Sequence, residues 1–236
     1  MRIHKQANRP NLYVKIPGTP AGVPAIEEAI FAGVPVNVTL LFSREQYLAI
    51  AEAYLRGIER RLAAGLDLRV SSVASLFVSR WDGAVADKVP QELRNRLGIA
   101  IAARTYRAHN DLLAGKRWRD LEAAGARKQR MLWASTGTKD PKAPPGLYVE
   151  ALAAPDTIDT MPEKTLLAFA AGGSVKSAMP KDGGDAEQVL AEFARAGIDI
   201  GALAARLQSD GADAFVKSWR ELMQRIADKS AVLATS

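Results

Sequence analysis

The stretches NLYVKI (residues 11–16) and VNVTLLF (residues 36–42) decide the fold class, because both have the apolar, β-branched character of strands. Between them, a helical pattern is predicted to begin at Thr19-Pro20 and to stop at Gly33. A strand, a helix and a second strand in this order are typical of a parallel βαβ unit. The sequence therefore indicates an α/β protein, and its first strand carries a charged residue, Lys15, in its interior.

The same alternation continues along the chain. Ser43 with Gln46 three residues later predicts a capped helix that Gly65 ends. Further strands are expected at residues 68–78, 129–134 and 157–161. Further helices are expected at about 90–124 (broken near Gly115), 147–153, from Pro162, 185–195 and 198–230. An open doubly wound sheet would usually carry a GxGxxG turn after its first strand, and this chain has none there. Residues 1–236 are interpreted as a single domain.

Composition narrows the function classes. The chain has 236 residues, 48% of them hydrophobic, and no cysteine, which excludes disulfides and thiolate chemistry. The net charge of +6 suits anionic small substrates, and because the basic residues are dispersed we expect no nucleic-acid partner. Of the two histidines, His109 is expected to be solvated, and no metal site is predicted. No membrane span or signal segment is recognisable, so a cytoplasmic location is expected.

Lys15 is the first candidate for chemistry. A lysine inside a strand is costly to bury without a purpose, and near the carboxyl end of a parallel strand it would point into the mouth of a barrel. Desolvation there would leave neutral amine able to attack a carbonyl group. The alternative is an edge-strand lysine that reaches water. Asn37 and Thr39, two residues apart, share one face of the next strand and could hold a substrate hydroxyl and a water. Alternatively, they are a polar strand start and a β-branched filler.

Two later strands also end in polar residues. In SLFVSRWD (residues 75–82), Arg80 offers a forked donor set that suits phosphate, although an ion pair with Asp82 or another carboxylate would explain it as well. In WASTGTK (residues 133–139), small hydroxyl residues, a glycine and Lys139 resemble a phosphate nest, with an ordinary loop as the alternative. Their shared position, at the carboxyl ends of successive strands, favours one common site.

Motifs over nearly the whole chain resemble those of transaldolases, in the same order. The motifs are RPNLYVKIPGT (9–19), NVTLLFS (37–43), SLFVSR (75–80), WASTGTK (133–139), YVE (148–150) and PDTIDTMP (155–162). The resemblance is to the branch that also occurs fused to glucose-6-phosphate isomerase. It implies a TIM (β/α)8-barrel enzyme of the pentose phosphate pathway in which Lys15 forms the Schiff base and Thr39 holds the catalytic water. The positions it assigns to substrate or phosphate are Asn37, Ser75, Arg80, Ser135 and Lys139.

The same resemblance implies the partners. A dihydroxyacetone unit would pass between ketose and aldose phosphates, with no cofactor and no metal. The sugar phosphates are fructose 6-phosphate, sedoheptulose 7-phosphate, erythrose 4-phosphate and glyceraldehyde 3-phosphate.

The resemblance also places Lys15 in the fourth strand of the barrel. The chain is therefore expected to form an incomplete barrel of about five β/α units, strands 4 to 8, plus C-terminal helices. The portion before it would supply an aspartate from the first strand and an acid–base glutamate from the third; Glu27 and Glu28 are expected to face away from the mouth. Three interpretations stay open: a fragment or mis-started reading frame, one half of a split enzyme with a separate N-terminal half-barrel, and a non-catalytic sugar-phosphate-binding remnant.

Overall fold

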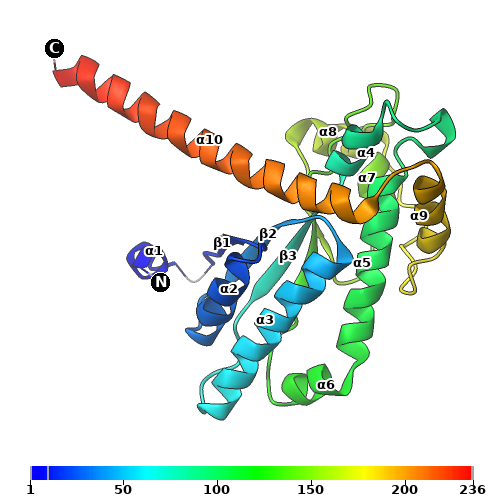
Figure 1. Ribbon diagram of the computed structural model, residues 1–236. Helices are drawn as coiled ribbons and strands as arrows, with labels where there is room; N and C mark the ends of the chain where they lie inside the picture. Colours follow the sequence, from blue (N-terminus) through cyan, green and yellow to red (C-terminus); the bar gives the residue numbers. More distant parts are fainter. Residues whose placement is uncertain (1, 10, 235–236) are drawn as a thin grey trace.

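A parallel sheet forms the centre of the computed structural model, which describes residues 2–9 and 11–234 (Figure 1). Its strands are β1 (Val14–Pro17), β2 (Val36–Leu41), β3 (Ser72–Phe77), β4 (Arg130–Ala134) and β5 (Ile158–Asp159). Four of the five fall within the predicted ranges, and β1 extends one residue beyond its range, to Pro17; each strand is shorter than predicted.

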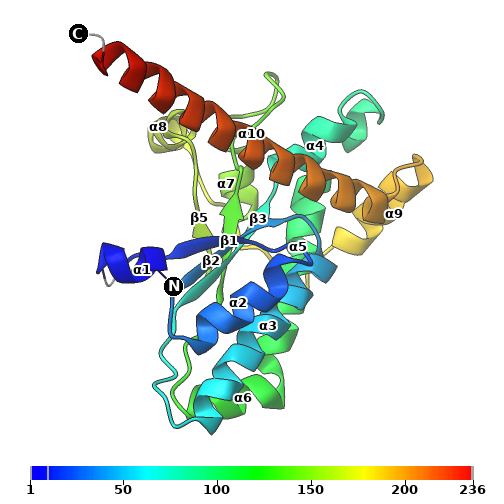
Figure 2. The same ribbon diagram turned by 60° about the vertical axis from the view of Figure 1, so that its left-hand side comes forward.

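The strands lie in the sheet in chain order, β1-β2-β3-β4-β5, and every neighbouring pair is parallel. The helices α2 (Gly22–Phe31), α3 (Arg44–Ala63) and α5 (Leu97–Ala114) lie together on one side of the sheet (Figures 1 and 2). A doubly wound sheet would reverse its strand order and carry helices on both faces. Sequential order with helices on one side is instead consistent with the TIM-barrel family.

The predicted start of α3 is confirmed in atomic detail. Ser43 has extended backbone, and its Oγ accepts a hydrogen bond from the Gln46 backbone N–H at 3.2 Å. The Gln46 side chain reaches back and accepts from the Phe42 N–H at 2.7 Å, one residue earlier than in the standard box. Between α2 and α3 the helices approach closely at Gly57, where an added Cβ would lie 2.8 Å from Ile30.

Two predictions about the region after β3 are wrong. A short helix that was not predicted, α4 (Ser79–Val85), begins directly after the strand, and the 3-10 turn η1 (Gln91–Leu93) delays the start of the next helix to Leu97. The expected break near Gly115 is confirmed, because α5 ends at Ala114 and α6 (Lys116–Ala123) begins at Lys116. His109 is 2% exposed rather than solvated. It faces the core from α5, where its Nδ1 lies 2.8 Å from the Tyr47 hydroxyl of α3. Neighbouring polar residues in the sequence hid this, because they occupy the other faces of the helix.

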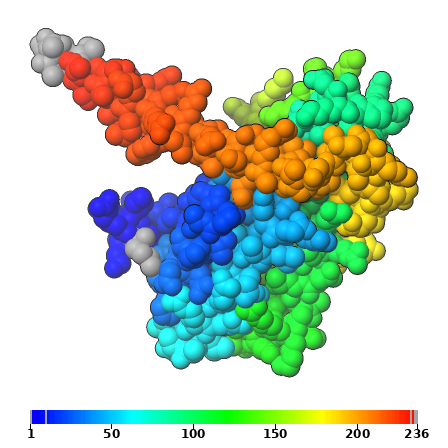
Figure 3. All heavy atoms as spheres, viewed as in Figure 1, coloured from blue at the N-terminus to red at the C-terminus, as the bar shows by residue number. Residues whose placement is uncertain are grey.

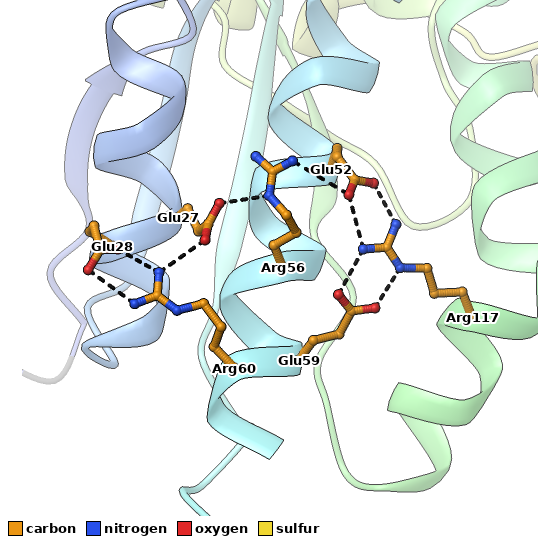
Figure 4. Close-up of polar contacts among 7 residues, drawn as sticks. All are labelled: Glu27, Glu28, Glu52, Arg56, Glu59, Arg60 and Arg117. Carbon is orange, nitrogen blue, oxygen red and sulfur yellow. Dashed lines mark hydrogen bonds and ion pairs between the residues drawn. The ribbon is translucent and has the colours of Figure 1, made fainter. Parts of the chain in front are cut away.

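Charged side chains connect the outer surfaces of the helices (Figure 4). Glu27 of α2 pairs with Arg56 and Arg60 of α3, at 2.7 and 3.0 Å. Arg117 of α6 joins Glu52 and Glu59 of α3, at 2.5 and 2.6 Å. Glu27 is thus engaged on the helix layer, as is Glu28, which pairs with Arg60 at 2.5 Å. The expectation that both glutamates face away from the carboxyl ends of the strands is confirmed.

The remaining helices are α1 (Arg2–Ala7), α7 (Leu147–Ala151), α8 (Glu163–Gly172), α9 (Ala186–Arg195) and α10 (Ile200–Ala234). The first part of α10 crosses the carboxyl ends of β1 and β2, and its outer part projects away from the body (Figures 1 and 3). None of the helices in the described part of the chain is long and apolar enough to cross a membrane.

Candidate functional site

Lys15 and Asn37 are register partners on β1 and β2. Register partners in a parallel ladder project from the same face, and on β3 that face also carries Ser75. The opposite face carries Trp133, which contacts Tyr106 of α5 edge-on, so it is the face that the helices cover. The lysine and its neighbours therefore lie on the side of the sheet away from α5, and Lys15 itself is exposed.

A hydrogen bond joins two of the predicted residues. The Ser75 hydroxyl donates to Asn37 Oδ1 at 2.7 Å, which leaves the Asn37 amide group to donate elsewhere. Thr39, two residues further along β2, is 1% exposed, and its Oγ1 is buried with no hydrogen-bond partner among the described residues. A buried hydroxyl is normally paired, so this one is an exception that calls for a reason. Lys15, Asn37, Thr39 and Ser75 form one polar group on adjacent strands.

Arg80 lies at a different place from the one expected. It belongs to the first turn of α4 rather than to the end of β3, and its guanidinium lies 4.9 Å from the centre of the Phe77 ring. Among the ion pairs of the described residues there is none between Arg80 and Asp82, whose carboxylate turns away to accept from the backbone N–H groups of Leu97 and Gly98 and from the Tyr148 hydroxyl.

Asp82 thereby connects α4 to the first turn of α5 and to α7. Burial raises the pKa of this carboxyl group to about 6, against the lowering effect of its three hydrogen bonds. The alternative interpretation of Arg80, an ion pair with Asp82, is wrong for this structure, and Arg80 keeps its donors for another acceptor.

Ser135 follows β4 in the left-handed region, with φ of 58°, and its Oγ lies 3.0 Å from the Ser79 Oγ. Because Ser79 immediately precedes Arg80, this contact brings the end of β4 against the start of α4. Lys139 lies further out. It lines a cavity of about 280 Å³ together with Asp82, Arg94 and Asp140, and none of the other predicted site residues lines it. The structure thus places four of the seven candidates on one face of β1, β2 and β3, Arg80 and Ser135 in the segments that follow β3 and β4, and Lys139 at a neighbouring cavity.

Sequence reasoning missed the contribution of α10. The Gln208 amide donates to the carbonyl oxygens of Gly18 and Leu40, at 3.1 and 3.0 Å, and so fastens the helix over the ends of β1 and β2. The available signal was a glutamine among the apolar residues of an amphipathic helix. Among residues 2–9 and 11–234, no group of histidine, cysteine, aspartate and glutamate is placed to hold a metal ion.

Comparison with known proteins gives one consistent result. The transaldolase/fructose-6-phosphate aldolase family profile matches residues 1–226. The transaldolase of Saccharopolyspora erythraea is 44% identical over 232 residues, which are 95% of this chain and 63% of that protein. The transaldolase of Mycolicibacterium paratuberculosis is also 44% identical, over 234 residues, with the same coverage. That of Neisseria gonorrhoeae is 41% identical over 223 residues, 94% of this chain and 64% of the relative.

The chain therefore spans slightly less than two thirds of the length of these relatives. The matched region includes all five strands and every candidate residue. The chain belongs to the transaldolase/fructose-6-phosphate aldolase family.

Proposed function

We propose that this chain carries the Schiff-base centre of a transaldolase, with Lys15 as the nucleophile. The observation that carries the proposal is the placement of Lys15 beside Asn37, Thr39 and Ser75 on one face of adjacent strands, in a chain of the transaldolase family. An amine next to amide and hydroxyl groups can bind a polyhydroxy ketone and attack its carbonyl carbon.

The reaction follows from that chemistry. The Lys15 amine adds to the keto carbon of fructose 6-phosphate or sedoheptulose 7-phosphate, and loss of water gives an iminium ion. Removal of the proton from the C4 hydroxyl breaks the C3–C4 bond and releases an aldose phosphate, while the bonding electrons move into the iminium as an enamine. The enamine carbon then attacks the aldehyde of glyceraldehyde 3-phosphate or erythrose 4-phosphate, and hydrolysis returns the free lysine. The iminium accepts the electron pair, so the route requires no cofactor or metal.

The other candidate residues receive roles in the same proposal. Asn37 and Ser75 hold substrate hydroxyls, and the Thr39 hydroxyl, which has no hydrogen-bond partner among residues 2–9 and 11–234, holds the water that moves protons. Arg80 binds the phosphate, because its guanidinium has no carboxylate partner among the ion pairs of the described chain. Ser135, linked to Ser79, and Lys139 at the adjoining cavity complete the phosphate end.

The test is a transfer assay. The purified chain is incubated with sedoheptulose 7-phosphate and glyceraldehyde 3-phosphate, and formation of fructose 6-phosphate is followed. Activity that Lys15→Ala removes and that Lys164→Ala, an exposed lysine of α8, leaves intact would support the proposal. Binding of fructose 6-phosphate without any turnover would favour the second candidate, a sugar-phosphate-binding protein.

We further propose that the five strands are strands 4 to 8 of a (β/α)8 barrel, completed by a half-barrel that pairs with the edge strand β1. Two observations support this. β1 is an edge of the sheet, so its outer side offers unpaired backbone groups. In addition, α10 projects beyond that edge with an apolar stripe that includes Trp219, Leu222 and Ile226, at 62%, 49% and 49% exposure (Figure 1).

Co-expression tests the half-barrel proposal. The part of the Saccharopolyspora erythraea relative that the alignment leaves uncovered would be produced together with this chain. Co-purification of the two, with transfer activity above that of this chain alone, is the expected result. Separate elution of two folded pieces would contradict it.

A further inference from the structure

We propose that α10 forms the wall of the site that selects for phosphorylated substrates, with Gly211 at the phosphate end and Phe215 at the amine end. This inference rests on the proposed Schiff-base function and extends it to a helix that supplies none of the predicted residues. Contacts of three residues along one face of α10, four contacts in all, carry the argument.

The first two contacts fix the position of the helix. Gln208 is 8% exposed, and its single amide nitrogen donates to the carbonyl oxygens of both Gly18 and Leu40. These carbonyl groups belong to the carboxyl ends of β1 and β2, where the chemistry is placed. Because a buried amide that lost these acceptors would stay unpaired, the contact is costly to break. The helix is thus held at a defined height over the strand ends.

The backbone of β2 is shaped for this contact. Leu40 has φ of 59°, a left-handed conformation that is uncommon for a leucine, and the register between β2 and β3 shifts between Val38 and Leu41. Such a conformation costs about 1–2 kcal/mol and persists only where the surroundings impose it. Here the shift presents the Leu40 carbonyl to Gln208, directly after Thr39 on the same strand. The left-handed conformation in β2 and the position of α10 therefore depend on each other.

The third contact lies one turn further along the helix. A Cβ added to Gly211 would lie 2.7 Å from Leu40 Cδ2 and 3.3 Å from the Arg80 guanidinium nitrogen Nη1. The bare backbone of α10 is therefore in van der Waals range of the arginine that we assign to phosphate. Any side chain at this position would displace either the leucine or the guanidinium group. Glycine is otherwise unfavourable inside a helix by about 1 kcal/mol, so the close approach supplies a reason for it.

The fourth contact reaches the nucleophile. The ring of Phe215, one further turn along, lies over the Lys15 amine, with Nζ 5.6 Å from the ring centre. An aromatic face at this distance attracts the ammonium group and shields one side of the amine from water. A single helix face thus touches the proposed nucleophile and the proposed phosphate arginine at two positions four residues apart. The space between them is where the carbon chain of a ketose phosphate would extend.

The test uses two substrates that share the reacting carbons and differ at the phosphate end. Fructose 6-phosphate would contact α10 at both Gly211 and Phe215, whereas dihydroxyacetone, which has no phosphate, would contact it only at Phe215, beside Lys15. Adducts on Lys15 are trapped with borohydride over a range of substrate concentrations in the full chain. The variants are Gly211→Ala and its control Gly201→Ala, an exposed glycine in the first turn of α10 whose added Cβ would meet only Asp199 Oδ1 at 3.5 Å.

Gly211→Ala should raise the half-saturating concentration of fructose 6-phosphate by about tenfold or more, the usual effect of disturbing a charged hydrogen bond. In the same variant, the half-saturating concentration of dihydroxyacetone should stay within about twofold of the wild-type value. Gly201→Ala should give the wild-type concentrations for both substrates. Equal effects of Gly211→Ala on both substrates, or no effect on either, would overturn the proposal.

Phe215 provides a second variant in case Gly211→Ala fails to fold, because its side chain is already 45% exposed. Phe215→Leu should slow adduct formation with both substrates about threefold, and Phe215→Tyr should restore it, because the ring holds the Lys15 side chain at the site and covers one side of Nζ. If Phe215→Leu formed the adduct at the wild-type rate, the proposed role of Phe215 beside the Lys15 amine would be wrong. Absence of any adduct in the wild type would instead remove the Schiff-base function itself, and the role of α10 with it.

Discussion

Two buried titratable groups, Asp82 and His109, act on stability in opposite directions over the acid range. Burial lowers the pKa of His109 to about 4 from 6.5, so between these pH values the unfolded chain binds the extra proton and stability rises with pH. Burial raises the pKa of Asp82 to about 6 from 3.8, so over that range the folded chain binds the extra proton and stability falls as pH rises. The two contributions oppose each other between about pH 4 and 6.

The His109 contribution can be isolated by substitution. His109→Gln keeps a polar group near Tyr47 but removes the titration. Between pH 4 and 6.5, His109 should add about 3 kcal/mol to the free energy of unfolding of the wild type, and this increase should be absent from the variant. Urea unfolding at several pH values in this interval measures the difference in slope between the two chains. Parallel pH profiles would show that His109 does not titrate as a buried group.

Removal of the Thr39 hydroxyl should affect turnover without lowering stability. This hydroxyl is buried with no hydrogen-bond partner in the described part of the chain, so Thr39→Val should leave the free energy of unfolding unchanged or raise it by about 1 kcal/mol. Turnover should nevertheless fall at least about 100-fold, because the group that holds the proton-moving water is lost.

Thr136→Val is the matched control for Thr39. The Thr136 hydroxyl donates to Asp159 at 2.8 Å, so its loss should destabilise the chain by about 1–2 kcal/mol. Thermal unfolding and the transfer assay on both variants make the comparison. A destabilised Thr39→Val with normal turnover would assign Thr39 to the core alone.

At the scale of elements, ion pairs fasten α6 to α3. Arg117 lies between Glu52 and Glu59 and is 43% exposed, and these hydrogen bonds raise the pKa of the guanidinium (Figure 4). Arg117→Met should cost only about 0.5–1 kcal/mol, since water screens exposed pairs.

That cost should shrink when salt is raised from about 0.05 to 1 M, because the Debye length falls to about 3 Å. Guanidinium chloride would itself screen the charges, so urea unfolding at the two salt concentrations is the suitable measurement. A loss above about 3 kcal/mol that salt leaves unchanged would mean that Arg117 acts through packing instead.

The sequence predicted elements better than it predicted connections between them. All five strands and the capped start of α3 followed from local pattern, because alternation and capping are encoded within a few residues. The short helix α4 was missed, since its seven residues follow the strand SVASLF with no turn residue between them. Its discovery matters for the site, because Arg80 lies on this helix.

The partners of individual side chains were the least predictable part. Asn37 and Thr39 could be placed on one face of β2 from period-two alternation, but the position of Asn37 beside Lys15 depends on the register between β1 and β2. That Asp82 would cap α5 and that Gln208 would reach Gly18 depends on contacts 15 to 190 residues apart. No local pattern encodes such distances.

At the scale of the whole molecule, the outer part of α10 stands clear of the body (Figure 3). Trp219, at 62% exposure, lies on the stripe that we assign to the half-barrel partner. Trp219→Gln should change the free energy of unfolding of this chain by less than about 0.5 kcal/mol, as is usual for exposed positions.

The same substitution should reduce self-association and weaken co-purification with the half-barrel, because a large exposed apolar group is lost. Light scattering against concentration, together with urea unfolding, follows both effects. A loss of stability above about 2 kcal/mol would show that Trp219 already packs within this chain.

The central claim, an imine at Lys15, is tested most directly by borohydride trapping. The purified chain is incubated with fructose 6-phosphate and reduced, and the adduct is located by peptide mapping, with Lys15→Ala and Lys164→Ala in parallel. The account predicts one reduced adduct on the peptide that contains Lys15, present in Lys164→Ala and absent from Lys15→Ala. A folded wild-type chain that gives no adduct, or an adduct that persists in Lys15→Ala, would contradict it.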